Sequence, residues 1–360
     1  MRLGTAVIDI TPPVGVELSG YVARRQPSTG VHDPLFARAL WLRAGAGRLL
    51  WLHADLIGFE HDFVVTLQQE LAALFGLAPH ELVLSATHTH SGPAVIHLTS
   101  CGAYETEYVA RLRADLLALA AAATRDEDEV TLCGSEGRCT LGIERRGRPS
   151  RHTDPRLAAL GWRRADGKYA AALTIYGMHN VALSAENRLI SADIAGRAAR
   201  TLADRLPGHP TVLVVNGAAG NVNPPAVRND FSPVAEWGDE LARCAGAALD
   251  AAVAGPPQSD VVAARAETVA VPVVPLTSAD AAAMAERFKR DLAGQSGYVP
   301  DRIRDAFDRW AAARRDDEPA ALPLNVQALR LGDTAIVAVA AEPFSVLGDQ
   351  LTAGAGRPVY

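Results

Sequence analysis

The sequence Leu-Val-Leu-Ser-Ala-Thr-His-Thr-His-Ser-Gly-Pro, residues 82–93, guides the interpretation of the whole chain. An apolar run leads directly into His88 and His90, and the pattern then breaks at Ser-Gly-Pro. Side chains alternate between the faces of an extended strand, so we expect the two imidazoles to project from the same side. Neutral imidazole is a common zinc ligand. Alone, the stretch predicts either the start of a metal site or a hydrogen-bonded histidine pair at a strand end.

Composition limits the classes of protein and partner. The chain has 360 residues, 49% hydrophobic and 21% charged, which is enough to bury the core of one large domain or two intimately packed ones. The formal net charge of -6 and the lack of a Lys/Arg tract argue against nucleic-acid binding. Residues 1–10 lack the features of a signal peptide, and the apolar segments 116–123 and 335–341 are too short to span a bilayer. We therefore expect a soluble, cytoplasmic protein without membrane insertion, and its oligomeric state stays open.

The cysteines show no zinc-ribbon or redox CxxC spacing. Cys133 and Cys139 could face each other across a hairpin and form a disulfide. For a chain of this size with four cysteines, scattered reduced thiols are the favoured interpretation.

Helical and strand patterns alternate along the chain, which predicts an α/β fold with a mixed β-sheet core and packed helices. Strand patterns cover residues 3–10, 37–42, 48–54, 82–85, 130–133, 138–143, 157–162, 169–176, 211–215, 261–275, 325–331 and 334–339. Helical patterns cover residues 62–76, 105–124, 194–206, 235–253, 278–293 and 300–315, and a short helix follows Phe344. Residues 294–300 are expected to interrupt the helices, and no repeat or low-complexity linker marks a domain boundary.

Potential metal ligands recur where predicted strands end: His88 and His90, His179, and Glu342. Sites in α/β proteins gather at the carboxyl ends of strands, and three protein ligands plus a water are typical of catalytic zinc. The glycine-rich loop 216–225 predicts either an anion-binding concavity or an ordinary tight loop. The cluster 144–148 predicts either a solvated loop or an arginine site for a substrate carboxylate or phosphate.

Motifs along almost the whole chain carry a family resemblance, and Thr-His-Thr-His-Ser-Gly-Pro is the most specific of them. The others are Ala-Val-Ile-Asp-Ile-Thr-Pro (6–12), Gly20-Tyr21, Phe-Ala-Arg-Ala (36–39), His179, Leu-Ile-Ser-Ala-Asp (189–193), Ala-Gly-Asn-Val-Asn-Pro (219–224) and Glu-Pro-Phe (342–344). In this order they resemble the neutral/alkaline (non-lysosomal) ceramidase family, specifically its N-terminal catalytic domain, in the form of a short bacterial-type homologue. The resemblance implies a single ceramidase-like catalytic domain over residues 1–360, truncated at its C-terminus and without the family's immunoglobulin-like domain.

The resemblance also implies roles for individual residues. His88, His179 and Glu342 match ligands of Zn²⁺. His90 matches a histidine beside the metal that binds or polarises the substrate amide, and Arg145 matches an arginine that lines the site.

Two positions depart from the family pattern. Asn223 stands where the family carries a serine proposed as the nucleophile, and a carboxamide cannot take that role. The zinc-bound water would then attack directly, with Asn223 available to donate a hydrogen bond to the oxyanion. The family's tyrosine zinc ligand lies in a segment beyond the last residue of this sequence, and Tyr360 is not an obvious match, so the fourth ligand stays open.

These residues predict a zinc-dependent hydrolase that cleaves a linear amide bond of a small or acylated metabolite. An alternative is metal-dependent acyl transfer or cyclisation in a biosynthetic pathway, and a third is a non-catalytic relative. Hydrolysis ranks first and the non-catalytic relative last, because three ligand-type residues occur at matching places. The lack of a signal peptide argues against extracellular ceramide as the natural substrate.

The remaining histidines and two aspartates have ordinary explanations. Asp55 and Asp193 follow predicted strands, where each either orients a metal-binding histidine or caps a turn, and we favour the capping role by roughly two to one. We expect loop or surface positions for the other histidines: His32, His53, His61, His80, His97, His152 and His209.

Overall fold

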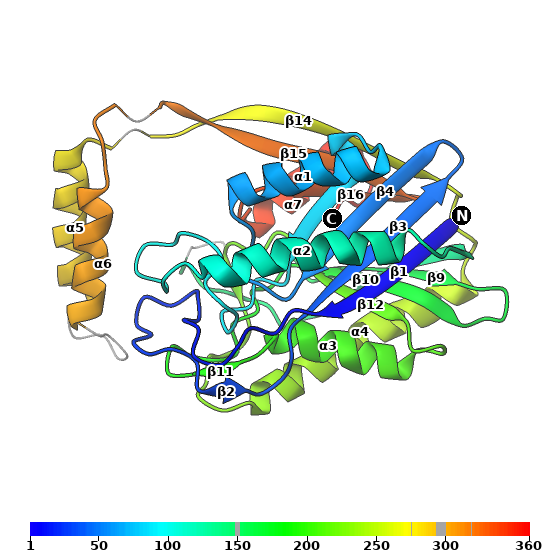
Figure 1. Cartoon of the computed structure of the whole chain (residues 1–360), viewed down its shortest axis with the longest axis horizontal. Coiled ribbons are helices and arrows are strands. Elements are labelled where there is room, and N and C mark those ends of the chain that lie inside the picture. The colour runs from blue at the N-terminus through cyan, green and yellow to red at the C-terminus, as the bar shows by residue number, and fades with distance from the viewer. Residues whose placement is uncertain (148–151, 275, 293–299, 318) are drawn as a thin grey trace.

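Two β-sheets packed face to face form the centre of the molecule, and a pair of helices covers the outer face of each sheet (Figure 1). The computed structural model describes residues 1–147, 152–274, 276–292, 300–317 and 319–360. Both sheets contain parallel and antiparallel strand pairs. The predicted α/β fold with a mixed β-sheet core and packed helices is therefore confirmed.

The first sheet comes from the N-terminal third of the chain. Its strands β4 and β5 run parallel, and its other neighbouring pairs are antiparallel. Two helices, α1 (His61–Phe75) and α2 (Thr106–Ala123), bury leucines such as Leu71 and Leu116 against its outer face. The strand order is β5 (Leu82–Ala86), β4 (Gly47–Ala54), β3 (Phe36–Ala44), β1 (Arg2–Asp9) and β6 (Asp128–Glu129).

The second sheet comes from the middle of the chain. All eight residues of its strand β10 are buried, as expected for a central strand that is covered on both faces. Helices α3 (Asp193–Arg205) and α4 (Ser232–Ala254) pack on the outer face through Leu202 and Leu249. The strand order is β12 (Thr211–Asn216), β10 (Tyr169–Tyr176), β9 (Arg156–Arg163) and β7 (Thr131–Arg138).

Large apolar side chains fill the space between these two sheets. Leu42 and Trp51 of the first sheet lie in one buried cluster with Leu160 and Trp162 of the second. Burying a side chain of this size contributes roughly 1.5–3 kcal/mol. This core fixes the strand ends of the two sheets relative to each other, and the candidate site residues follow those ends.

A third sheet extends from the central pair and carries a helical hairpin. It has the order β14 (Val262–Pro272), β15 (Ala321–Leu331) and β16 (Thr334–Val339), followed by helix α7 (Ser345–Ala355). Helices α5 (Ser278–Leu292) and α6 (Pro300–Ala312) stand away from the sheets at the far end of β14 and β15 (Figure 1). Shorter elements are β2 (Gly30–Val31), the 3₁₀ helix η1 (Pro79–Glu81), β8 (Ile143–Glu144), β11 (Leu189–Ile190) and β13 (Val222–Asn223).

One predicted pair of strands is wrong. Residues 130–133 and 138–143 were expected to form two strands, across which Cys133 could have faced Cys139, although reduced thiols were the favoured interpretation. Instead β7 is a single strand, so Cys133 lies near its start and Cys139 just past its end. At 3.2–3.4 Å per residue, about 20 Å of strand separates the two cysteines, which excludes a disulfide between them. The other predicted helices and strands agree with described elements apart from shifts of a few residues at their ends, whereas the short elements β2, η1, β6, β11 and β13 were not predicted.

Two further expectations concern the C-terminal half and the membrane. The predicted interruption at 294–300 lies outside the described residues, except for Pro300, which begins α6. Among the helices that are described, none is long and apolar enough to cross a membrane. The single catalytic domain over residues 1–360 stays a prediction.

Candidate metal centre

His88 follows the first sheet, but in a conformation that differs from the predicted one. Strand β5 ends at Ala86, and His88 has a φ of 61°, in the left-handed region. His88 and His90 therefore do not alternate on an extended strand, and that expectation is wrong. The turn nevertheless brings the two Nε2 atoms to 3.3 Å from each other.

The backbone at Thr87 is held by side chains from the second sheet. Asn216, the last residue of β12, donates from Nδ2 to the Thr87 carbonyl oxygen at 2.9 Å. Asn180, which follows β10, also donates to this oxygen and bonds the Asn216 Oδ1 at 3.0 Å. Sequence reasoning did not single out either asparagine, although each lies at the end of a predicted strand. Together they tie the strand exits of the two sheets to each other.

His179 follows the central strand β10 and is almost completely buried. Its backbone amide donates to the Val222 carbonyl oxygen at 3.0 Å. Its ring Nδ1 lies 2.8 Å from the Ala219 carbonyl oxygen and 3.2 Å from that of Val222. The glycine-rich loop, for which an anion-binding concavity and an ordinary tight loop were the two alternatives, thus holds a histidine through its carbonyl groups.

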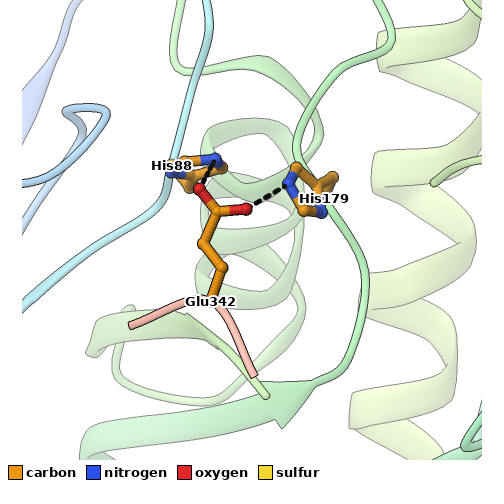
Figure 2. Close-up of side chains that lie close together, drawn as sticks. All are labelled: His88, His179 and Glu342. Carbon is orange, nitrogen blue, oxygen red and sulfur yellow. Dashed lines mark ion pairs between the residues drawn. The ribbon is translucent and has the colours of Figure 1, made fainter. Parts of the chain in front are cut away.

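Glu342 reaches the two histidines from the third sheet, where it follows β16 (Figure 2). Its Oε1 lies 3.5 Å from His88 Nε2, and its Oε2 lies 3.3 Å from His179 Nε2. The interaction with His179, followed by the charges of His88 and Arg145, lowers the pKa of Glu342 to about 2. The carboxylate is therefore ionised at neutral pH.

Gly220 permits the loop after β12 to approach Glu342. Its amide donates to the Pro343 carbonyl oxygen at 2.8 Å, and a Cβ at this position would overlap the Glu342 carbonyl oxygen. This close backbone approach is a packing role for the predicted glycine-rich loop.

His88, His179 and Glu342 fit the requirements of a metal centre. One ligand atom from each lies within 4.8 Å of the others. Zinc bonds of 2.0–2.2 Å in a tetrahedral site place neighbouring ligand atoms about 3.4 Å apart, close to the two distances above. The His88 Nδ1 is 2.7 Å from the Ile57 carbonyl oxygen, so in both histidines a backbone carbonyl fixes the Nδ1 proton and leaves Nε2 free to bind a metal.

His90 and Arg145 lie beside this group. His90 is outside the set of three converging ligand atoms, although its Nε2 contacts that of His88. Burial, followed by the charges of His88 and His179, holds the pKa of His90 well below its usual value. Arg145 Nη2 is 3.1 Å from His179 Nε2 and 3.8 Å from Glu342 Oε2, and it also donates to the Gly220 carbonyl oxygen.

Asn223 and Tyr360 are outside the group of three converging ligand atoms. Asn223 pairs with Ile143 through β13 and β8, and its buried Oδ1 has no hydrogen-bond partner among the described residues. The Tyr360 hydroxyl bonds the Glu136 carboxylate at 2.7 Å. The oxyanion role of Asn223 therefore stays a prediction. Tyr360 lines a cavity that His88, His179 and Glu342 also line, while its hydroxyl is bonded to Glu136.

A cavity of about 790 Å³ opens against the three converging residues. His88, His179 and Glu342 belong to its lining, whereas His90, Arg145 and Asn223 do not. Apolar side chains contributed by α1, the third sheet and the loops near them make up much of its wall: Ile57, Val64, Val65, Leu98, Val326 and Val339.

Among the described residues, no hydrogen bond joins Asp55 or Asp193, for which a metal-orienting role was the less favoured alternative, to His88 or His179. Asp55 Oδ2 accepts hydrogen bonds from the Phe36 amide at 2.9 Å and the Arg38 guanidinium at 3.0 Å. Asp193 Oδ1 accepts from the amides of Ala182 at 3.2 Å and Ile194 at 2.8 Å, at the start of α3. Backbone carbonyls orient His88 and His179 instead. The favoured capping role fits Asp193, at the start of α3, whereas Asp55 forms a buried ion pair with Arg38.

The prediction for the remaining histidines fails at one position. His53 is fully buried on β4, where its Nδ1 bonds Ser85 Oγ at 2.9 Å and burial lowers its pKa to about 3. The continuous apolar run of β4, which is buried on both faces, was a signal for this inward position. The others are exposed or half-buried: His32, His61, His80, His97, His152 and His209.

The fold and the side-chain cluster define a mixed α/β protein with a candidate three-residue metal centre where three sheets meet. Residues 1–128 match the family model described as neutral/alkaline non-lysosomal ceramidase, N-terminal. The predicted resemblance to that family is thereby confirmed.

Individual proteins that are similar to this chain are named neutral ceramidases. The neutral ceramidase of Pseudomonas aeruginosa is 27% identical over 219 residues, which cover 55% of this chain and 32% of that protein. Neutral ceramidase A of Dictyostelium discoideum is 25% identical over 221 residues, covering 55% of this chain and 31% of that protein. The matched region thus spans about a third of each curated relative.

A solved structure supports the fold over nearly the whole chain. The crystal structure of neutral ceramidase from Pseudomonas aeruginosa superposes with a TM-score of 0.75 at 20% sequence identity. The match covers 99% of this chain and 66% of that chain. At this identity the likeness establishes a shared fold.

Replacing Asp193 by Asn tests whether this buried carboxyl has a structural role and no role in metal binding. Burial raises its pKa from 3.8 to about 6, so folding favours the protonated form, and the free energy of unfolding falls as the pH rises through about 6. Asp193→Asn removes this loss and should be more stable than the wild type at pH 7.5, by on the order of 2 kcal/mol, and nearly equal to it at pH 3.5.

Denaturant unfolding at the two pH values measures the difference, and metal content should be the same in both proteins. A stability difference that does not change with pH, or a loss of metal in the variant, would contradict the assignment.

Proposed function

We propose that this protein is a zinc-dependent hydrolase that cleaves a linear amide bond of an acylated metabolite. The observation that carries the proposal is the convergence of His88, His179 and Glu342 within 4.8 Å against a cavity of about 790 Å³. The resemblance to proteins named neutral ceramidase supports amide chemistry, because ceramide is itself an N-acyl amide.

His88, His179 and Glu342 would hold the metal ion. When bound, zinc lowers the pKa of water to near neutrality and polarises a carbonyl group. The described donor set, two imidazoles and one carboxylate, is one that zinc accepts in hydrolytic sites. The ionised state of Glu342 and the Nε2 lone pairs of the two histidines give all three residues the form that a metal ion requires.

His90 would donate a hydrogen bond to the reacting amide. His88 has its Nδ1 proton engaged with Ile57, so its Nε2 is the acceptor in the contact with His90, and the His90 Nε2 carries the proton. Once the lone pair of His88 is used by a metal, this N–H is free for another acceptor. A donor there can stabilise negative charge that develops on the carbonyl oxygen.

Arg145 would orient the substrate. Its guanidinium is held by the Gly220 carbonyl oxygen and lies next to His179 and Glu342. A positive charge fixed in this place can attract a polar or anionic end of the substrate. Asn223 is proposed as a second oxyanion donor, and no hydrogen bond among the described residues joins its Oδ1 to the three ligands.

The cavity favours a substrate with an apolar acyl group. Its volume lies in the range of about 300–1,000 Å³ that small-molecule sites occupy. Apolar walls beside a polar cluster suit a molecule whose acyl chain is buried while its amide reaches the metal centre. Because the chain matches only part of each curated relative, ceramide itself is one member of this substrate class to be tested.

Two histidine substitutions separate the proposed roles. His88→Ala removes a ligand and should lose zinc and turnover together, whereas His90→Ala should keep zinc and lose about 100-fold or more in kcat. Zinc is measured by elemental analysis, and turnover with a panel of linear N-acyl amides. His209→Ala, at an exposed histidine, is the matched control and should retain both. Equal loss of zinc from the His88 and His90 variants would contradict the division.

Hydrolysis in ¹⁸O-labelled water tests the reaction type. Direct attack by water places one labelled oxygen in the released carboxylic acid, as mass spectrometry of the product would show. Acyl transfer or cyclisation gives a product without that label. Acyl transfer or cyclisation is tested because Asn223 stands in place of the family serine. An unlabelled acyl product would refute the hydrolase proposal.

A further inference from the structure

His90 is held differently from the two other histidines of the site. Backbone carbonyl oxygens accept hydrogen bonds from Nδ1 in both His88 and His179. The Nδ1 of His90 is buried and has no hydrogen-bond partner among the described residues. Another constraint must therefore fix the orientation of the His90 ring.

Gly20 supplies space for this ring. It has a φ of 99°, a conformation that residues with side chains rarely adopt. A Cβ built at Gly20 would lie 2.5 Å from His90 Nδ1 and would overlap the neighbouring ring carbon. Any larger residue at position 20 would therefore push the His90 ring out of its place.

Tyr21 packs edge-on against His90. The two ring centroids are 5.0 Å apart with an interplanar angle of 71°. The Tyr21 hydroxyl donates to the Leu183 carbonyl oxygen at 2.6 Å, which fixes the position of the tyrosine ring. Tyr21 thus gives the imidazole a rigid apolar neighbour.

Arg24 ties this loop to the backbone of His90. Its Nη1 donates to the carbonyl oxygens of His90 at 2.8 Å and Ser19 at 2.9 Å. Its Nε donates to the Asn187 carbonyl oxygen at 3.0 Å, and its guanidinium lies over the Tyr21 ring at 5.1 Å. The side chain is 7% exposed, so these contacts form in a buried environment.

We propose that Gly20, Tyr21 and Arg24 are positioning residues that set the His90 ring by packing, in place of the hydrogen bond that holds the other two histidines. They keep the His90 Nε2 directed at the Nε2 of His88, 3.3 Å away. The catalytic consequence rests on the proposed amide hydrolysis, in which His90 donates to the substrate. The structural consequence, a ring position that depends on Gly20, is independent of that reaction.

Two glycine substitutions test the proposal. Gly20→Ala adds a methyl group against the ring, and Gly15→Ala is its matched control, because Gly15 has a φ of 108° and an added Cβ meets nothing within 4 Å. Both variants carry similar backbone strain, and only the first contacts His90. In the zinc-loaded proteins we expect Gly20→Ala to lose about 100-fold in kcat with KM and zinc content nearly unchanged, since a misplacement of about 1 Å can cost that much. Gly15→Ala should behave as the wild type.

A spectroscopic measurement separates this proposal from the proposed reaction. In ¹⁵N-histidine-labelled, zinc-loaded protein, the His90 ring signal is the one that His90→Gln removes. Gly20→Ala should shift this signal and Gly15→Ala should not, whether or not an amide is hydrolysed. Identical His90 signals in the two glycine variants would overturn the proposal, as would equal kcat in an active enzyme.

Tyr21 provides a second pair of variants that does not strain the backbone. Tyr21→Phe keeps the ring and should retain the His90 signal and most of the turnover, whereas Tyr21→Leu removes the edge contact and should change both. If Gly20→Ala does not fold, the comparison of Tyr21→Phe with Tyr21→Leu tests the proposal in its place. Equal His90 signals in Tyr21→Phe and Tyr21→Leu would then refute the proposal.

Discussion

The carbonyl oxygen of Thr87 is the point on which the candidate site depends, because it joins the strand exits of two sheets. It accepts hydrogen bonds from the side chains of Asn180 and Asn216, which follow neighbouring parallel strands of the second sheet. Each such bond contributes about 0.5–1.5 kcal/mol, and an unmet buried partner costs about 1–3 kcal/mol. These two hydrogen bonds therefore favour one relative placement of the loops that carry His88 and His179.

Each of three sheets supplies one residue of the candidate metal centre. His88 follows the first sheet, His179 the second, and Glu342 the third. The apolar core between the sheets holds these strand ends in place without contacting the ligands, so the burial that stabilises the fold also arranges the site. Within this frame the histidines are held by two means: backbone carbonyls orient the proposed ligands, and packing against Gly20 and Tyr21 orients His90.

Much of the fold could be predicted from the sequence, because apolar periodicity and turn residues mark most strands and helices. The candidate ligands could be named from residue type, strand exits and family resemblance. The conformation of His88 could not, since nothing local distinguishes a left-handed histidine from an extended one. The backbone carbonyl groups that orient His88 and His179 could not be predicted either, because every residue has a carbonyl group. For the same reason a metal-orienting role for Asp55 or Asp193 could be considered from the sequence only as the less favoured alternative, and the structure pairs both carboxyls with other groups.

The central claim is that His88, His179 and Glu342 bind one zinc ion. Its most direct test is a crystal structure of the protein grown with zinc, with anomalous diffraction recorded on both sides of the zinc absorption edge. The account predicts a single strong anomalous peak about 2.0–2.2 Å from both histidine Nε2 atoms and a Glu342 carboxylate oxygen, with His90 outside that distance. A zinc peak bound by His90 in place of one of the three, or no peak at the cluster in zinc-saturated crystals, would contradict it.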